Sequence, residues 1–148
     1  MDRNDAVSVI EKLIETCRDG QKGYADAAEH VKRPDLKGYF QQQSAERGRF
    51  AQELERELSS LGKQDKRPSG SVAGALHRTW IDAKANLGGG DKTILESVEQ
   101  GEDSAKKAYE EAISAQLPSN LQSIVQRQAE SVKSAHDKVK SMRDSLAA

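Results

Sequence analysis

The sequence predicts an all-α protein built as a bundle of four long helices, and three observations support this fold class. Apolar and small residues recur at alternating steps of three and four in four segments, residues 5–31, 35–61, 91–115 and 120–146. No segment alternates apolar and polar residues as a half-buried strand does. The chain has 148 residues, of which 35% are hydrophobic and 32% are charged, as in an ordinary soluble domain. We therefore expect one domain over residues 1–148.

The first two segments predict an antiparallel helical hairpin. The second segment opens with Pro34, which is favourable in the first turn of a helix, and Gly62 ends it. The turn at residues 32–34 is so short that the two helices must be antiparallel neighbours. The residues that share one face are Ile10, Leu13, Cys17, Gly20, Tyr24, Ala27 and Val31 in the first helix and Leu36, Phe40, Gln43, Arg47, Phe50, Leu54 and Leu61 in the second.

The last two segments predict a second hairpin of the same kind. The third helix begins near Asp91, directly after three glycines, and it stops before Pro118. The turn at residues 116–119 is again short. The residues on the shared faces are Ile94, Val98, Gly101, Ala105, Ala108 and Ala112 in the third helix and Leu121, Val125, Gln128, Val132, Ala135, Val139, Met142 and Leu146 in the fourth.

A long connection joins the two hairpins, and it carries an apolar stripe of its own. This stripe predicts an extra helix over residues 71–87, about 25 Å long at about 1.5 Å per residue. Such a helix can return the chain along most of the bundle, so that the second and third helices run parallel. Trp80 is then expected to pack the crossover onto the bundle rather than to bind a ligand. The residues of the stripe are Val72, Leu76, Trp80, Ala83 and Leu87.

With two hairpins and one long crossover, the sequence resembles the ferritin-like superfamily. A closer resemblance rests on five stretches, LIETCRDGQKGY (13–24), ERGRFAQEL (46–54), SGSVAGALHRTW (69–80), GEDSAKKAYEEA (101–112) and AHDKV (135–139). In these stretches the sequence is similar to a bacterial family of uncharacterised four-helix-bundle proteins with that fold. The resemblance implies the fold and a bacterial setting, but that family supplies no known activity.

The metal ligands of ferritin-like di-iron proteins do not recur in their usual pattern. Those proteins use one Glu on each of two helices and a Glu-x-x-His on each of the other two. In the second helix, Glu46 is followed three residues later by Arg49, and in the fourth, Glu130 is followed by Lys133. A side chain that keeps its positive charge competes with a metal for the carboxylate. The glutamates that lie opposite the apolar faces, and are therefore expected to face water, are Glu15, Glu96 and Glu130.

A polar layer is expected near the middle of the bundle, where six side chains fall at similar heights when residues are counted at about 1.5 Å each. We favour a hydrogen-bonded network in which Arg47 pairs with Glu46 or Glu102 and Tyr24 donates its hydroxyl. A second interpretation is one divalent metal, iron or manganese, held by Glu46, Glu102 and His136. A third is a small-ligand pocket. The six residues are Tyr24, Gln43, Glu46, Arg47, Glu102 and His136.

Glycines inside the predicted helices need a compensating reason, because each costs about 1 kcal/mol relative to alanine. We expect close helix approach or room for the large side chains of the polar layer, and room for a cofactor is the other interpretation. No cofactor is predicted beyond the divalent metal already considered. The glycines are Gly20, Gly23, Gly38, Gly48 and Gly101.

Composition excludes several classes of function. The 23 basic and 24 acidic residues nearly cancel, which removes the electrostatic reason to expect a nucleic-acid or membrane-surface partner. No signal peptide and no apolar run of about 20 residues are present, so we expect a cytoplasmic protein. The single cysteine, Cys17, is expected to be a small buried hydrophobe rather than a reactive thiol. No phosphate loop, cysteine pair or serine–histidine pattern of catalytic type is found.

These observations predict a non-catalytic ferritin-like bundle, an interaction or stress-associated bacterial protein that acts through its surface or as a homo-oligomer. The alternative is a metal-binding oxidoreductase or storage protein with a degenerate carboxylate site for iron or manganese. A DNA-protecting ferritin relative is a third hypothesis, but it requires a basic tail or surface, and the near-zero net charge opposes it.

Overall fold

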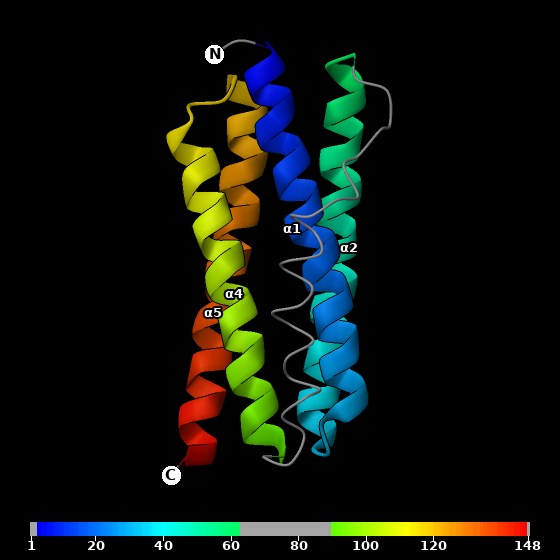
Figure 1. Cartoon of the computed structure of the whole chain (residues 1–148), viewed down its shortest axis with the longest axis vertical. Helices are drawn as coiled ribbons and strands as arrows, with labels where there is room; N and C mark the ends of the chain where they lie inside the picture. The colour runs from blue at the N-terminus through cyan, green and yellow to red at the C-terminus, as the bar shows by residue number, and fades with distance from the viewer. Residues whose placement is uncertain (1–2, 63–89, 148) are drawn as a thin grey trace.

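The computed structural model describes residues 3–62 and 90–147 and shows four long helices packed as a bundle (Figure 1). The four helices predicted from apolar periodicity are confirmed, and each observed end lies within two residues of its predicted position. The chain is therefore all-α in the part that the structure describes. The helices are α1 (Arg3–His30), α2 (Pro34–Ser60), α4 (Gly90–Ser114) and α5 (Ser119–Ala147).

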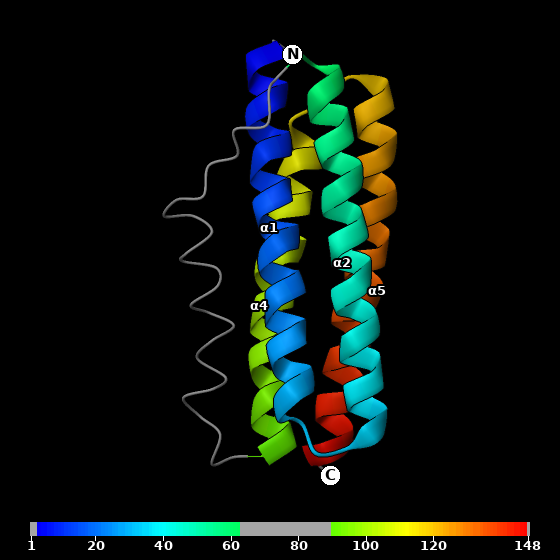
Figure 2. The ribbon, with the colours of Figure 1, turned by 90° about the vertical axis from the view of Figure 1, so that its right-hand side faces the viewer.

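Contacts between the helices establish their directions. Near the start of α1, Lys12 Nζ contacts Glu111 near the end of α4, whereas the backbone N–H of Lys32, just after α1, donates to Asp91 at the start of α4. Helices α1 and α4 are therefore antiparallel, as are α1 and α2, which a short turn joins. It follows that α2 and α4 run parallel, and that the end of α2 and the start of α4 lie at opposite ends of the bundle (Figures 1 and 2).

The predicted crossover lies outside the described residues. Residues 71–87 and Trp80 fall within residues 63–89, so the extra helix and the packing role of Trp80 stay predictions. The parallel course of α2 and α4 does not depend on them, because it follows from contacts between described residues.

Signals at the two ends of α2 explain where this helix begins and ends. Pro34 occupies the first turn after an extended Arg33, and Asp35 places a negative charge near the positive end of the helix dipole. At the other end, Gly62 has a φ of 83°, a left-handed conformation that glycine adopts without steric cost. Pro34 and Gly62 are the residues from which the sequence predicted the two ends of this helix.

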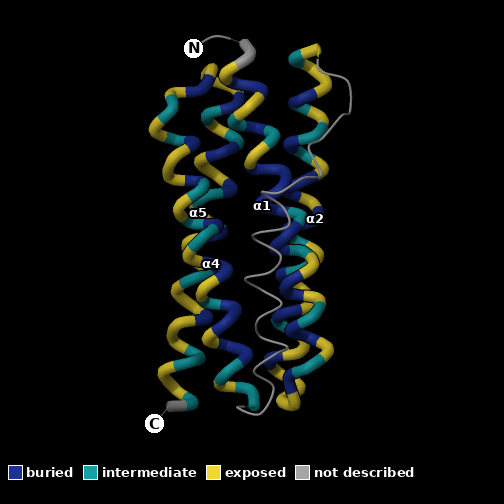
Figure 3. Tube along the Cα trace, viewed as in Figure 1, coloured by how far each residue is buried: buried dark blue, intermediate teal, exposed yellow. Residues whose placement is uncertain are grey.

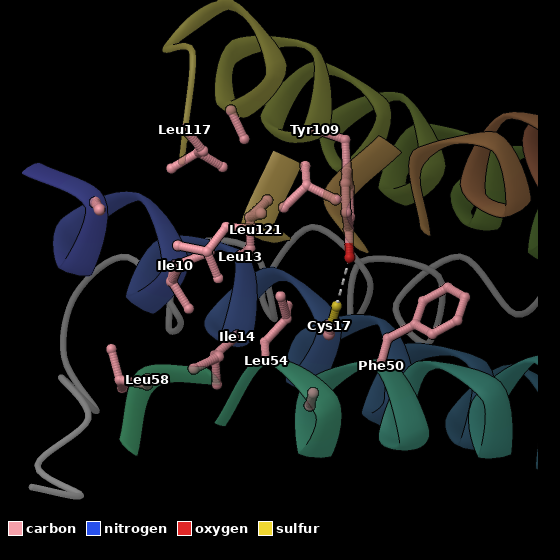
Figure 4. Close-up of a cluster of buried hydrophobic side chains, with 14 of the residues drawn as sticks. Ile10, Leu13, Ile14, Cys17, Phe50, Leu54, Leu58, Tyr109, Leu117 and Leu121 are labelled. Carbon is pink, nitrogen blue, oxygen red and sulfur yellow. Dashed lines mark hydrogen bonds between the residues drawn. The ribbon is translucent and has the colours of Figure 1, made fainter. Parts of the chain in front are cut away.

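Figure 3 shows the buried residues in dark blue. The apolar ones form two clusters at different levels of the bundle. One cluster gathers the first half of α1, the second half of α2, the second half of α4 and the first half of α5, and Figure 4 shows part of it. The other lies toward the α1–α2 turn. Large members of the first are Ile10, Leu13, Leu54 and Leu121, and of the second Tyr24, Leu36, Phe40 and Ile94.

One expectation about α1 is wrong. Glu15, which lies opposite the predicted apolar seam, is only 6% exposed, and Asp19 is only 4% exposed. Helix α1 packs against both α2 and α4, and its buried face is wider than the single seam drawn from the sequence. The other two glutamates for which we made this prediction, Glu96 and Glu130, are exposed as expected.

Candidate mid-bundle polar site

A buried triad of Tyr24, Arg47 and Glu102 joins α1, α2 and α4 near the middle of the bundle. The side chains of Arg47 and Glu102 are 1% and 0% exposed, and Arg47 Nη2 donates to Glu102 Oε2 over 2.5 Å. Tyr24 donates its hydroxyl to the same oxygen over 2.6 Å. Of the two partners expected for Arg47, the structure therefore uses Glu102. The triad belongs to a set of buried polar side chains between the two apolar clusters.

The neighbours of Arg47 show how a guanidinium fits inside the bundle. A Cβ atom at Gly20 would lie 3.2 Å from Arg47 Nη1 and 3.4 Å from Arg47 Cγ. Glycine at this position of α1 thus leaves room for Arg47, one of the two physical reasons expected for the helical glycines. On its other side, Arg47 Cζ lies 5.4 Å from the centroid of the Tyr24 ring, a distance that favours a cation–π contact.

Electrostatics keep Arg47 and Tyr24 protonated. Burial is the largest single influence on Arg47 and lowers its pKa, but the charge of Glu102, the neighbouring Tyr24 and the hydrogen bond to Glu102 together raise the pKa of Arg47 above its ordinary value. Burial, together with the charge of Glu102, also raises the pKa of Tyr24. Arg47 therefore stays a cation and Tyr24 a neutral donor at neutral pH. The triad holds one ion pair, between Arg47 and Glu102.

Several buried polar atoms around the triad have no hydrogen-bond partner among the described residues. They include Nε and Nη1 of Arg47, Oε1 of Glu102 and Oε1 of Gln43. Burying a polar atom without a partner costs about 1–3 kcal/mol, so the layer is less favourable than a fully satisfied network. The predicted hydrogen-bonded network is therefore incomplete, because these donor and acceptor atoms at its centre have no partner among the described residues.

A second buried polar chain was not predicted from the sequence. Tyr109 donates its hydroxyl to Gln128 Oε1 over 2.7 Å, and Gln128 Nε2 donates to Glu53 Oε1 over 2.8 Å. The Cys17 thiol lies 3.0 Å from the same hydroxyl (Figure 4), and it is the donor because Tyr109 has only one proton to give. Burial raises the pKa of Cys17 to about 11, which keeps the thiol protonated and unreactive.

The sequence did contain a signal for this chain. Gln128 stands on the apolar face of its helix, between Val125 and Val132, and a polar residue in such a place needs a partner. Tyr109 follows Ala105 by four residues and so lies on the same buried face of α4. Helical phase could have found both residues, but it could not have shown that they meet.

The structure does not bring the three proposed metal ligands together. Glu102 lies in the core, whereas Glu46, one residue before Arg47, is turned to a different side of α2 and is half-buried. The His136 ring, 12% exposed, contacts Asp103 through Nε2 and Asp137 through Nδ1, at 2.6 and 3.1 Å. Within residues 3–62 and 90–147, no group of three or more His, Cys, Asp or Glu side chains could hold a metal ion.

Glu46, Glu102 and His136 were expected to share one site because they have similar heights along the bundle. A shared site also requires that the side chains point the same way around their helix axes, and residues at one height can point to different sides. Glu102 and Arg47 agree in both level and direction. Glu46 and His136 agree in level alone.

Residues 5–116 match a family described as a domain of unknown function (DUF2383), which covers well over half of the chain. The chain belongs to this family. The region matched to DUF2383 holds α1, α2 and α4 and therefore the whole Tyr24–Arg47–Glu102 triad, whereas Gln128 and His136 of α5 lie beyond it. A search of curated proteins finds no match to the chain. None of the described helices of this DUF2383 member combines the length and the apolar character needed to cross a membrane.

Proposed function

We propose that this DUF2383 protein is a ferritin-like bundle without catalytic activity, which acts through its surface as an interaction or stress-associated bacterial protein. The observation that carries the proposal is the guanidinium of Arg47 paired with Glu102 at the middle of the bundle. In di-metal proteins of the ferritin-like fold, carboxylates at this place face metal ions held between the helices. Here a side chain with a permanent positive charge neutralises the carboxylate instead.

The arrangement of the helices supports the ferritin-like part of the proposal. The described helices form two hairpins, α1–α2 and α4–α5, and α2 runs parallel to α4. A chain with this arrangement needs one long crossover between α2 and α4, which is the connectivity of ferritin-like bundles. The turn at the end of α1 is held to the start of α4 by Asp91, whose two carboxylate oxygens accept the backbone N–H groups of Lys32 and Arg33 at 2.8 and 3.0 Å. The two hairpins are thus joined directly as well as through the crossover.

The charges around the triad support the absence of a metal-dependent activity. Arg47 cannot be deprotonated at physiological pH, so it repels a divalent cation that approaches Glu102. The net charge of −1 gives no electrostatic reason for binding to a nucleic acid or a membrane surface. The partner in this proposal is therefore a second copy of the chain or another protein.

Replacing Arg47 with alanine tests the proposal. The change leaves Glu102 buried without its cation, and breaking such a pair typically costs about 3–5 kcal/mol. It also removes the charge that repels a metal. We expect Arg47→Ala to melt at a lower temperature than wild type in chelator and to be partly rescued by added Mn²⁺, Fe²⁺ or Zn²⁺, because a ligand of the folded state stabilises it by mass action. Wild type should gain no comparable stability.

Arg49→Ala is the matched control, because it removes the same charge from an exposed position of the same helix. It should change neither the melting temperature nor the response to metal. If wild type instead gains several degrees with metal, and Glu102→Gln abolishes this gain, the alternative of a metal-binding oxidoreductase or storage protein is correct. Metal analysis of protein purified without chelator, and light scattering across a range of concentrations, examine metal content and self-association in the same samples.

A further inference from the structure

Four buried polar atoms of the mid-bundle layer need partners that the described side chains do not supply. Two are donors, the Nε and Nη1 groups of Arg47, and two are acceptors, Oε1 of Glu102 and Oε1 of Gln43. None of these three side chains is more than 9% exposed, so bulk solvent does not reach the four atoms. Buried polar atoms are nearly always satisfied, either by the protein itself or by ordered water. The layer therefore needs a bound molecule that supplies these hydrogen bonds.

The four atoms lie close enough together to share one site. Gln43 and Arg47 stand four residues apart on the buried face of α2, a spacing that makes them neighbours on the surface of a helix. Glu102 reaches the same place from α4, because its Oε2 atom accepts from Arg47 Nη2 over 2.5 Å. Free donors and free acceptors are thus gathered around one buried ion pair.

The mixture of donors and acceptors determines which ligand fits. An anion would satisfy the two N–H groups of Arg47 but would leave Oε1 of Glu102 and Oε1 of Gln43 without a donor. A metal ion or another cation would do the reverse, and the charge of Arg47 would repel it. Water both donates and accepts, and a buried water typically makes about three hydrogen bonds to polar groups of the protein. Roughly one or two water molecules therefore satisfy all four atoms.

The most widely separated pair of neighbouring helices lies beside this layer. Helices α2 and α5, which Figure 2 shows beside each other, approach each other least closely in the bundle. Gln43 of α2 and Ala135 of α5 line the same open groove of about 460 Å³, and the single methyl group of Ala135 extends little toward α2. Both residues are buried at the floor of this groove, so solvent in the groove lies one side chain away from the layer.

We propose that the mid-bundle layer binds ordered water, held between Arg47, Glu102 and Gln43, as an integral part of the core. The water accepts from Nε or Nη1 of Arg47 and donates to Oε1 of Glu102 and Oε1 of Gln43. It thereby completes the hydrogen bonding that a buried ion pair needs. This site goes beyond the proposed function, which concerns the surface of the protein and its lack of catalytic activity.

Nuclear magnetic resonance of the full chain tests the proposal through the nuclear Overhauser effect between water and the Nε–H proton of Arg47. We expect wild type to give a signal of the sign that marks long-lived bound water. Gln43→Met removes the amide but keeps the length of the side chain, so this signal should lose intensity. Gln41→Met, the same change at an exposed position of α2, should keep the wild-type intensity. Tyr24→Phe should also keep it, because the Tyr24 hydroxyl donates to the other oxygen of Glu102.

A crystal structure of wild type soaked in bromide identifies the bound molecule without a variant. Ordered water should lie within hydrogen-bond distance of Arg47 and of Oε1 of Glu102 or Gln43, and no anomalous bromide peak should appear there. The proposal is overturned by a bromide peak beside Arg47, or by an Arg47–Glu102 pair that satisfies these atoms without solvent.

In solution, the proposal is overturned if wild type gives no water signal or if Gln43→Met leaves the signal unchanged. Equal losses in Gln41→Met and Gln43→Met, or a loss in Tyr24→Phe, which would assign the signal to the exchanging hydroxyl, also contradict it. None of these measurements uses an added metal. Failure here therefore leaves the expected metal response of Arg47→Ala unaffected, and the two proposals can be separated.

Discussion

Arg47 illustrates how a charged side chain is accommodated inside a small bundle. A buried cation is tolerated only with a close counter-ion and with space for its bulk. Glu102 supplies the counter-ion and Gly20 leaves the space, and the two residues belong to different helices. The effect of a side chain at position 20 should therefore depend on Arg47, which is distant in sequence, and this dependence can be measured.

Substituting Gly20 and Gly38 with alanine should have opposite effects. At Gly38, nothing lies within 4 Å of the new Cβ, so Gly38→Ala should stabilise the protein by about 1 kcal/mol through helix propensity alone. At Gly20 the Cβ would press on Arg47 at 3.2 Å, and the ion pair limits how far Arg47 can move. Gly20→Ala should therefore be neutral or destabilising in urea unfolding.

Arg47→Ala provides the background that separates the two effects at Gly20. Once the guanidinium is absent, Gly20→Ala should become stabilising, as Gly38→Ala is in wild type. If Gly20→Ala stabilises wild type and Arg47→Ala protein equally, the glycine does not serve to make room for Arg47.

The burial of Asp19 predicts how stability depends on pH. Burial, and to a lesser extent the charge of Glu15, raises the pKa of Asp19 to about 7, against about 3.9 in an unfolded chain. Between these values the unfolded state loses its proton while the folded state keeps it. Stability contributed by Asp19 is thus fully present below about pH 4 and is lost as pH rises to about 7.

Asp19→Asn should remove the loss of stability that Asp19 causes as pH rises. The variant should melt above wild type at pH 8, and the difference should vanish at about pH 3 and below, where Asp19 is protonated in both states. The melting temperature of the variant should still fall somewhat as pH rises, because burial also raises the pKa of Glu15. Melting curves at several pH values check the prediction, with Glu29→Gln as the exposed control on α1. An equal offset at all pH values would mean that Asp19 is ionised in the folded protein at pH 5.

At the scale of the elements, the helix boundaries follow local signals. Pro34, Gly62 and Pro118 either restrict the backbone or permit a conformation that ends a helix, and these effects involve only neighbouring residues. The sequence could therefore predict the boundaries to within two residues. The contact of Asp91 with the α1–α2 turn was not predicted, because it joins residues almost sixty positions apart.

Asp91→Ala should loosen this junction without unfolding the bundle. The carboxylate accepts two backbone N–H groups, of Lys32 and Arg33, at an exposed site, so its loss should cost about 1 kcal/mol. Hydrogen exchange at these two amides should become faster, while exchange in the middle of α1 stays unchanged. Asp91→Asn keeps one acceptor oxygen and should have an intermediate effect. Unchanged exchange at both amides in Asp91→Ala would show that the contact does not hold the turn.

At the scale of the whole molecule, the polar side chains divide the core into two apolar clusters. Apolar packing alone allows neighbouring helices to slide past one another, whereas a buried ion pair is satisfied in one register only. The triad and the Cys17–Tyr109–Gln128 chain together link all four helices, at levels about two helical turns apart. A slip of one helix along its neighbours would therefore separate the partners of these contacts.

Local patterns in the sequence by themselves determined the class of fold, the four helices, their ends and the parallel course of α2 and α4. They also placed Tyr24, Arg47 and Glu102 on inward faces at one level, because phase and rise along a helix are regular. The tertiary structure alone decided which of these side chains meet. It paired Arg47 with Glu102 rather than Glu46, turned His136 toward Asp103, and buried Glu15. Such outcomes depend on how helices rotate and pack against several neighbours at once, and no single helix carries that information in its own sequence.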